Sequence, residues 1–179
     1  MPFTYRFIDS PVGPLKLVAK GEALAAILWE NDRPNRVLLG AMSEDLDSDL
    51  LGRTEQQLTE YFTGTRRCFD LPLDFHGTAF QKSVWQALLA IPFGETRSYL
   101  QIAIAIGNPA AVRAVGAANG KNPISIIAPC HRVIGSSGAL TGFAGGLAAK
   151  QWLLTLEGGL PRSMSTCNRD AAPAQASLF

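Results

Sequence analysis

A cysteine lies between a proline and two ionisable residues in the back half of the chain. The stretch "SIIAPCHRVIG", residues 125–135, passes from apolar residues through Cys130 to His131 and Arg132. A thiol attacks as the thiolate, and free cysteine has a pKa of about 8.5, so a reactive cysteine needs a base or a cation nearby. The pattern therefore points to nucleophilic chemistry at Cys130.

His131 is the candidate base, and its position next to the cysteine limits how it can act. Residues 122–130, "NPISIIAPC", have the pattern of a short buried strand. Neighbouring side chains of an extended chain point to opposite faces, so we expect His131 to take the thiol proton through a water molecule. A base needs an orienting partner, and Glu157 is the candidate. The helix dipole disfavours a carboxylate in a last turn by about 0.3–1 kcal/mol, yet an exposed glutamate that tolerates this cost is the simpler reading of position alone.

Capping signals predict the helices that would position these residues. Thr78 with Gln81 and Ser98 with Gln101 have capping-box spacing, and the second of these helices is expected to end at Gly107. Asn108 and Pro109 predict the start of a further helix that ends at residue 120. Two short helices joined by a tight turn are typical of a helix-turn-helix, although generic helical hairpins are common. A glycine-rich loop over 135–146 and a last helix over 147–158 follow.

The front of the chain predicts a different architecture. Residues 3–9, 15–19 and 24–30 read as three antiparallel strands separated by turns, residues 32–49 as loop with some helix, and residues 49–64 as a helix. The fold class is therefore α+β: a small amino-terminal antiparallel-sheet domain with a helix, followed by a mainly helical domain. We expect domains at 1–75 and 76–159, and a disordered tail over 160–179 that includes Cys167.

Composition limits the classes of protein. Hydrophobic residues make up 47% and charged residues 17%, which is ordinary for a globular chain. There is no apolar run near the ~20 residues of a membrane span and no signal-peptide pattern. The three cysteines are odd in number and widely spaced, which is not the pattern of a disulfide framework. A reducing compartment, the cytoplasm, is expected, with no membrane association.

Charge is distributed unevenly along the chain. Residues 1–75 hold eight Lys and Arg against twelve Asp and Glu, whereas residues 76–158 hold six against two. A basic back half suits a polyanion such as DNA, although chance and solubility explain the asymmetry equally well.

The motifs of the back half are long enough to carry a family resemblance. "FGETRSYLQIAIAIGNPAAVRAVGAANG", "NPISIIAPCHRVIGSSGALTGFAGG" and "KQWLLTLEG" resemble the methylated-DNA–protein-cysteine methyltransferases. The resemblance covers residues 80–158, and residues 1–75 fit the family's front domain by pattern alone. It implies repair of duplex DNA without a cofactor. The alkyl group of O-6-alkylguanine, and of O-4-alkylthymine, would pass irreversibly to the protein's own cysteine after base flipping.

The resemblance also implies residue roles. Cys130 would be the alkyl acceptor, His131 the water-linked base and Glu157 its partner. Asn122 would brace the turn before the cysteine. Tyr99 would lie beside the guanine, help to rotate the nucleotide and act as a donor as charge develops on the leaving base. Without the flanking motif, a half-buried helix tyrosine would be the simpler interpretation of Tyr99.

The remaining implied roles concern DNA and the substrate pocket. Arg113 would fill the gap left by the flipped nucleotide, from a helix whose small residues suit the minor groove or, alternatively, close helix packing. The residues expected to contact DNA are Arg113, Ala114, Tyr99, Ala110, Lys121 and Arg132, of which Arg132 could instead brace the structure. The residues expected to form the pocket are Val133, Ser136, Gly142, Phe143, Ala144 and Lys150.

Other functions are weighed against this one. No zinc-ligand pattern is evident around Cys68 and His76, which are eight residues apart, so we expect no metal site. A DNA-damage binder without chemistry would lack Cys130, and a cysteine hydrolase usually takes its cysteine and histidine from distant segments. A transcription regulator would require a preferred operator sequence. The prediction is a monomer that acts on alkylated duplex DNA.

Overall fold

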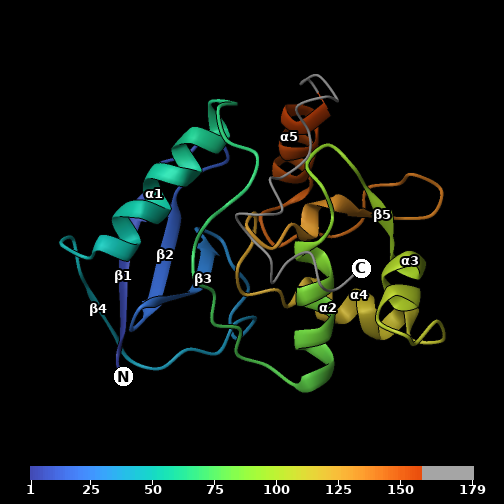
Figure 1. Cartoon of the computed structure of the whole chain (residues 1–179), viewed down its shortest axis with the longest axis horizontal. Coiled ribbons are helices and arrows are strands. Elements are labelled where there is room, and N and C mark those ends of the chain that lie inside the picture. The colour runs from blue at the N-terminus through green and yellow to red at the C-terminus, as the bar shows by residue number, and fades with distance from the viewer. Residues whose placement is uncertain (159–179) are drawn as a thin grey trace.

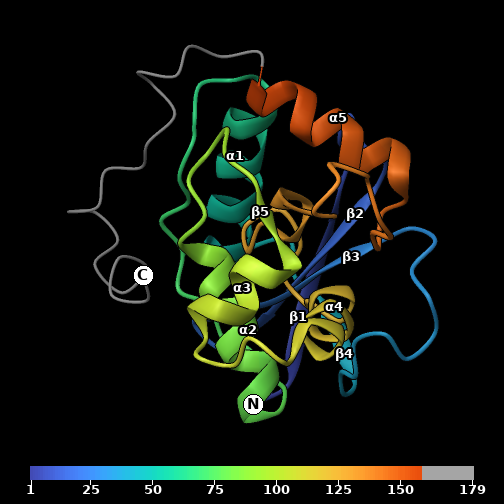
Figure 2. The ribbon, with the colours of Figure 1, turned by 90° about the vertical axis from the view of Figure 1, so that its right-hand side faces the viewer.

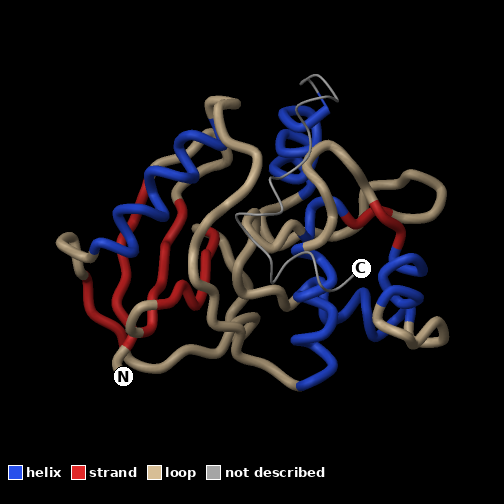
Figure 3. The backbone as a smooth tube through the Cα atoms, viewed as in Figure 1, coloured by secondary structure: helices blue, strands red, loops and turns tan. Residues whose placement is uncertain are grey.

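The computed structural model describes residues 1–158, which form a sheet-and-helix part and a helical part that lie side by side (Figure 1). The predicted tail over 160–179, with Cys167, lies outside the described residues. Figure 3 shows that most strands belong to the front part and most helices to the back part. The α+β prediction is confirmed.

Four strands form the front sheet. β1 (Phe3–Ile8), β2 (Leu15–Lys20) and β3 (Ala23–Trp29) are the antiparallel strands expected from the alternating pattern. The fourth, β4 (Met42–Glu44), pairs in parallel with β1, so the sheet order is β3-β2-β1-β4. The sequence prediction missed this strand because three largely exposed residues carry no alternating apolar pattern.

One helix packs on this sheet. α1 (Asp49–Phe62) begins at the N-cap Ser48, whose side chain accepts a hydrogen bond from the Leu51 amide, and it runs along the sheet in Figure 1. Its buried face includes Leu51, Leu58 and Tyr61. Residues 63–78 connect α1 to the helical part of the molecule, and they run beside α1 before they enter it (Figure 1).

The helical part contains α2 (Ala79–Leu89), α3 (Tyr99–Ala105), α4 (Val112–Gly120) and α5 (Leu147–Gly158). Figure 2 shows α3 and α4 close together on the side that faces the viewer, with α5 above them. Both predicted capping boxes, Thr78 with Gln81 and Ser98 with Gln101, are present in full. A two-residue strand, β5 (Arg97–Ser98), pairs in parallel with β6 (Val133–Ile134) just after the cysteine.

Two local predictions are wrong. Asn108 and Pro109 do not open α4. They form a turn closed by a 3.0 Å bond from the Ala111 amide to the Asn108 carbonyl, and the helix begins only at Val112. Residues 122–130 do not form a strand. One bridge residue, Ile124, is followed by tight turns that lead into the 3₁₀ helix η1 (Cys130–Arg132).

The two parts share one core and one strand edge. Buried side chains continue without a break from the sheet through α1 and α2 to α5. The outer edge of β3 receives two segments: the Leu24 amide donates to the Pro72 carbonyl, and the Ile27 amide to the Pro123 carbonyl, both at 2.8 Å. The front sheet therefore holds directly the turn that precedes Cys130.

Candidate active site

The cysteine sits at the end of a turn braced by Asn122. The side-chain Nδ2 of Asn122 donates to the Ala128 carbonyl at 2.8 Å, and its Oδ1 accepts from the backbone amide of Ile124 at 3.1 Å. Between these bonds Ile126 has φ of 75°, a conformation that a β-branched residue adopts only where its surroundings enforce it. Asn122 thus fixes the approach to Cys130, in the bracing position that we expected for it.

Burial and nearby polar groups act in opposite directions on the thiol. Cys130 is 3% exposed, and this burial raises its pKa. Hydrogen bonding by Asn122 and Ser125 and the charges of Arg36 and Lys150 work to lower the pKa without cancelling the effect of burial. The resting sulfur is therefore a thiol, and its reaction requires a base.

His131 is held by a buried carboxylate. Its Nε2 atom lies 2.8 Å from Glu157 Oε1, and both side chains are almost completely buried. The exposed-glutamate alternative for Glu157 is excluded, since this residue is 2% exposed. Desolvation would raise the pKa of Glu157, but the hydrogen bonds from His131 and Arg132 and the charge of Arg132 outweigh it and hold the pKa far below its usual range. Glu157 is a stable carboxylate in the interior.

The hydrogen bond fixes the form of the imidazole. Burial lowers the pKa of His131 more than Glu157 raises it, so the ring is neutral at rest. Since a carboxylate can only accept, Nε2 carries the proton and Nδ1 has the free lone pair. Nδ1 is buried without a hydrogen-bond partner among the described residues. The same residues include no hydrogen bond between the ring and Cys130, so the ring can act on the sulfur only through an intervening group.

Arg132 is in the interior, and its assignment as a DNA contact is corrected. Its Nε donates to Glu157 Oε2 at 2.9 Å, while one terminal nitrogen donates to Glu157 Oε1 at 2.8 Å and the other to the Ile91 carbonyl at 2.6 Å. The side chain is 6% exposed. Its charge balances Glu157, and the guanidinium is not available to a phosphate.

The front part supplies residues that the sequence did not indicate. The Tyr61 hydroxyl donates to Glu157 Oε1 at 2.8 Å, and the Trp29 indole donates to Ser125 Oγ at 3.1 Å, beside the cysteine turn. Arg36 donates to the Asn122 carbonyl at 2.7 Å and pairs with Asp32. Tyrosine and tryptophan on apolar faces read as core residues, so no sequence signal separated them from packing.

A groove of about 700 Å³ lies where three segments meet: the front loop (residues 33–36), the helix-turn-helix formed by α3 and α4, and the glycine-rich loop (residues 135–146). One wall comes from α4 and Tyr99, and Tyr99 forms a hydrogen bond with Thr141 of the opposite wall. The lining residues are Arg33, Pro34, Asn35, Arg36, Tyr99, Val112, Gly116, Ala117, Gly120, Lys121, Thr141, Gly142, Phe143 and Ala144. Four expected site residues, Lys121, Gly142, Phe143 and Ala144, thus join Tyr99 in one cavity.

The other expected residues occupy three kinds of position. Arg113, Ala114 and Ala110 are exposed on or just before α4. Lys150 is completely buried, and its Nζ donates to the Val133 carbonyl at 2.7 Å and to the Thr141 carbonyl at 3.2 Å, which ties the pocket loop to the residue after η1. Ser136 is exposed and does not line the groove.

Within residues 1–158 we find no cluster of three His, Cys, Asp or Glu side chains that could bind a metal ion. Every helix in the same range is too short or too polar to cross a membrane. The molecule combines a helix-turn-helix, a groove beside it, and a buried cysteine that is followed by a histidine held by a carboxylate. This combination is expected of a protein that performs covalent chemistry on DNA.

Comparison with known proteins gives the family. The model of the "6-O-methylguanine DNA methyltransferase, DNA binding domain" matches residues 79–159, and the model of the "ribonuclease-like domain" of the same methyltransferase matches residues 3–75. A methylated-DNA–protein-cysteine methyltransferase of Mycobacterium tuberculosis is 48% identical over 98% of this chain and 98% of its own. One from Methanosarcina acetivorans is 47% identical over 86% and 97%.

A solved structure agrees with these matches. The crystal structure of Mycobacterium tuberculosis OGT in complex with DNA has a TM-score of 0.81 and 46% identity, and covers 98% of this chain and 99% of its own. The chain belongs to the 6-O-methylguanine DNA methyltransferase family.

Proposed function

We propose that Cys130 is the residue that accepts the alkyl group when this chain repairs DNA. The chain performs direct alkyl transfer, the reaction of its family, and neither a binder without chemistry nor a hydrolase is favoured. The observation that carries the assignment is the buried set of His131 and Glu157 beside Cys130, with Nε2 to Oε1 at 2.8 Å and Nδ1 without a partner. This geometry leaves one basic lone pair for the thiol proton.

The transfer can be written with every atom accounted for. The Cys130 proton passes through a bridging water to His131 Nδ1, and Glu157 stabilises the imidazolium that results. The sulfur forms a bond to the alkyl carbon while the bond from that carbon to the O-6 oxygen breaks, and the electron pair of the broken bond remains on guanine. The Tyr99 hydroxyl stabilises the leaving base, which takes up one proton to become guanine, and the proton that His131 accepted balances it when it is released. A thioether has no easy leaving group, so each molecule reacts once.

Of the residues expected to contact the base, Ala144 lines the groove, whereas Cys130 and Val133 belong to η1 and the residue after it and are not among the lining residues. The carbonyls of Cys130 and Val133 would accept from the guanine amine, and the Ala144 amide would donate to the O-6 oxygen. The bonds from Lys150 to the Val133 and Thr141 carbonyls hold two of these backbone segments at a fixed separation. The pocket is thereby preorganised around a planar base.

DNA would approach the exposed face of α4. Gly116, Ala117 and Gly120 line the groove there, and short side chains allow the helix to enter a minor groove about 6 Å wide. Arg113 and Lys121 are exposed on the same helix and at its end, where cations can meet phosphates. The alkylated nucleotide would leave the stack, at a cost of a few kcal/mol, and Arg113 would take its place. O-4-alkylthymine is included in the proposed substrates. We also propose that the chain works as a monomer in the cytoplasm.

Mass spectrometry tests the assignment. After incubation with a duplex that contains one O-6-methylguanine, we expect one added methyl group on the peptide that holds Cys130, and unmodified guanine in the DNA. Cys130→Ser should gain no methyl group, whereas Ser variants of the other two cysteines should be methylated like the parent. A methyl group on another residue, or an unaltered protein mass with the lesion intact, would refute the proposal.

A further inference from the structure

A tyrosine of the front part contacts the carboxylate that orients His131. Tyr61 lies in the last turn of α1, and its hydroxyl donates to Glu157 Oε1 at 2.8 Å. Tyr61 is completely buried and Glu157 is 2% exposed. The bond therefore joins the helix on the sheet to α5 inside the molecule, where water does not compete.

Three donors converge on this one oxygen. Oε1 of Glu157 accepts from Tyr61, from His131 Nε2 and from a terminal nitrogen of Arg132, each at 2.8 Å, whereas Oε2 accepts from Arg132 Nε alone. A carboxylate oxygen has two lone pairs, so these donors share its electron density. Each added donor leaves less negative charge to stabilise a protonated imidazole.

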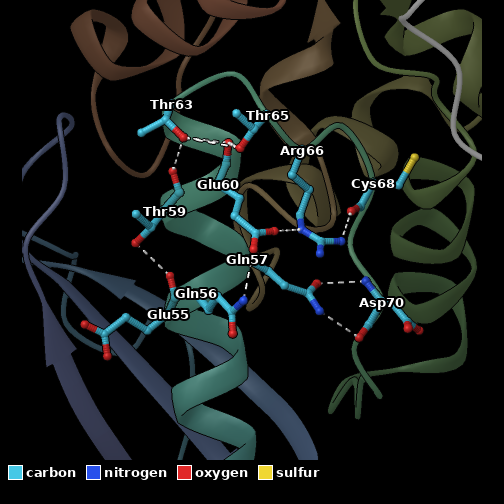
Figure 4. Close-up of polar contacts among 10 residues, drawn as sticks. All are labelled: Glu55, Gln56, Gln57, Thr59, Glu60, Thr63, Thr65, Arg66, Cys68 and Asp70. Atoms are coloured by element: carbon cyan, nitrogen blue, oxygen red, sulfur yellow. Dashed lines mark hydrogen bonds and ion pairs between the residues drawn. The ribbon is translucent and has the colours of Figure 1, made fainter.

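The tyrosine is firmly placed. Its ring contacts those of Phe62, Phe69 and Phe93, with centroids 5.4–6.2 Å apart. Figure 4 shows how the segment after α1 is attached to the helix: Gln57 both donates to the Asp70 carbonyl and accepts from the Asp70 amide. This keeps Phe69 against Tyr61 and fixes the direction of the hydroxyl.

We propose that Tyr61 is a positioning residue of the reaction, which sets the basicity of His131 by sharing Oε1 of Glu157 with it. The inference rests on the proposed function, in which His131 accepts the thiol proton. Tyr61 acts only as a donor, because burial and then the Glu157 charge raise its pKa well above the ordinary value. The front part of the chain would thus take a direct part in the chemistry.

The direction of the effect follows from the groups around the ring. Glu157 favours protonation of His131, while Arg132 of η1 and Lys150 of α5 oppose it. The Tyr61 hydroxyl hydrogen points at the shared oxygen, so it opposes protonation as well. Tyr61→Phe removes that hydrogen and keeps the ring, and the pKa of His131 should rise, by about half a unit to one unit.

Histidine NMR measures this without substrate. The chain has two histidines, and exposed His76, which pairs with Asp74, serves as an internal reference. Titration of the imidazole signals from about pH 5 to about pH 8 should show an upward shift for His131 in Tyr61→Phe and none for His76. Thr54→Val is the matched control: it removes a hydroxyl buried in the same helix that donates only to the Leu50 carbonyl. It should leave both titrations unchanged.

Alkyl transfer provides the second readout. His131 must be neutral to act as a base, so the acid limb of the rate should move to higher pH in Tyr61→Phe by the same amount as the NMR shift. The rate should be several-fold lower on the acid limb of the profile and within about twofold of the parent on its plateau. Thr54→Val should keep the parent profile.

A second variant, in which the donor at position 61 is strengthened rather than removed, provides a test if Tyr61→Phe folds poorly. Site-specific 3-fluorotyrosine at position 61 is a stronger donor of nearly the same size, and it should lower the pKa of His131. Identical His131 titrations in the parent and the fluorinated chain, or in the parent and Tyr61→Phe, would overturn the proposal and leave Tyr61 a packing residue. Failure of Cys130 to accept a methyl group would instead refute the proposed function. The NMR titration needs no substrate, so it would still show whether Tyr61 affects the pKa of His131.

Discussion

The two parts of the molecule support the thiol in different ways. The back part carries the recognisable motif, with Cys130, His131 and Glu157 on η1 and α5. The front part carries no motif, yet Tyr61 contacts Glu157, Trp29 contacts Ser125 and Arg36 contacts the Asn122 carbonyl. In the proposed reaction, the back part supplies the groups that react, and the front part supplies donors that hold them. Four predictions test this division.

The largest expected effect concerns the back part. Glu157→Gln removes the charge that balances Arg132 in the interior and leaves a buried cation unpaired, which typically costs about 3–5 kcal/mol. Chemical denaturation should show this loss, and methyl transfer should fall sharply because His131 loses its orienting carboxylate. Glu55→Gln breaks a pair with Arg6 in which the carboxylate is 44% exposed, and it should cost much less. Equal losses in the two variants would contradict the assignment.

Acid should act on the same buried group. The folded pKa of Glu157 is lowered, so its contribution to stability is complete above the unfolded value of about 4.3 and is lost as the pH falls below it. Burial lowers the pKa of His131, so the unfolded chain binds that proton more readily, and stability also falls as the pH drops below about 6.5. Urea unfolding between about pH 7 and about pH 2 should show both losses, and Glu157→Gln should lack the loss below about pH 4.3. A flat profile would mean that this pair does not govern acid stability.

A third test addresses the contact between the parts. A Cβ built at Gly145 would lie 2.6 Å from the Trp29 ring, so Gly145→Ala must displace either the pocket loop or the indole. We expect a loss of about 1–3 kcal/mol and slower transfer. Gly142→Ala is the matched control, since a Cβ there meets nothing within 4 Å. Thermal unfolding and transfer kinetics of the two variants measure the difference; similar behaviour would show that the front part does not shape the pocket.

The smallest effect is expected at the front loop. Arg36→Met removes a donor from the Asn122 carbonyl and a positive charge that lowers the pKa of the Cys130 thiol. The reaction of Cys130 with iodoacetamide at pH 7 should slow a few-fold and recover at higher pH, where the thiolate forms without help. Arg33→Met, in the same loop but exposed, should react at the parent rate. An unchanged rate in Arg36→Met would show that this charge does not act on the thiol.

The sequence predicted the parts that local rules govern. The capping boxes at Thr78 and Ser98 and the three long strands depend on neighbours within a few residues, and each was predicted close to its observed bounds. The group formed by Cys130, His131 and Glu157 was predicted because the motif around it is long.

The features that were missed depend on contacts between distant segments. The turn over residues 122–130 replaces the predicted strand because Asn122 bonds across it and Ile126 adopts a left-handed conformation, neither of which an apolar pattern reveals. The roles of Tyr61 and Trp29 depend on the direction of one hydroxyl and one indole nitrogen. Periodicity places such side chains in the core but does not show where their polar atoms point.

The wall that α4 contributes to the groove consists of Val112, Gly116, Ala117 and Gly120, whose side chains carry no donor or acceptor. Such a surface cannot distinguish one base pair from another, because base pairs differ in the hydrogen-bond donors and acceptors that they present in the grooves. In the proposed reaction, selection of a lesion would then occur at the cavity, where the extruded base binds, and α4 would contact any DNA sequence equally well.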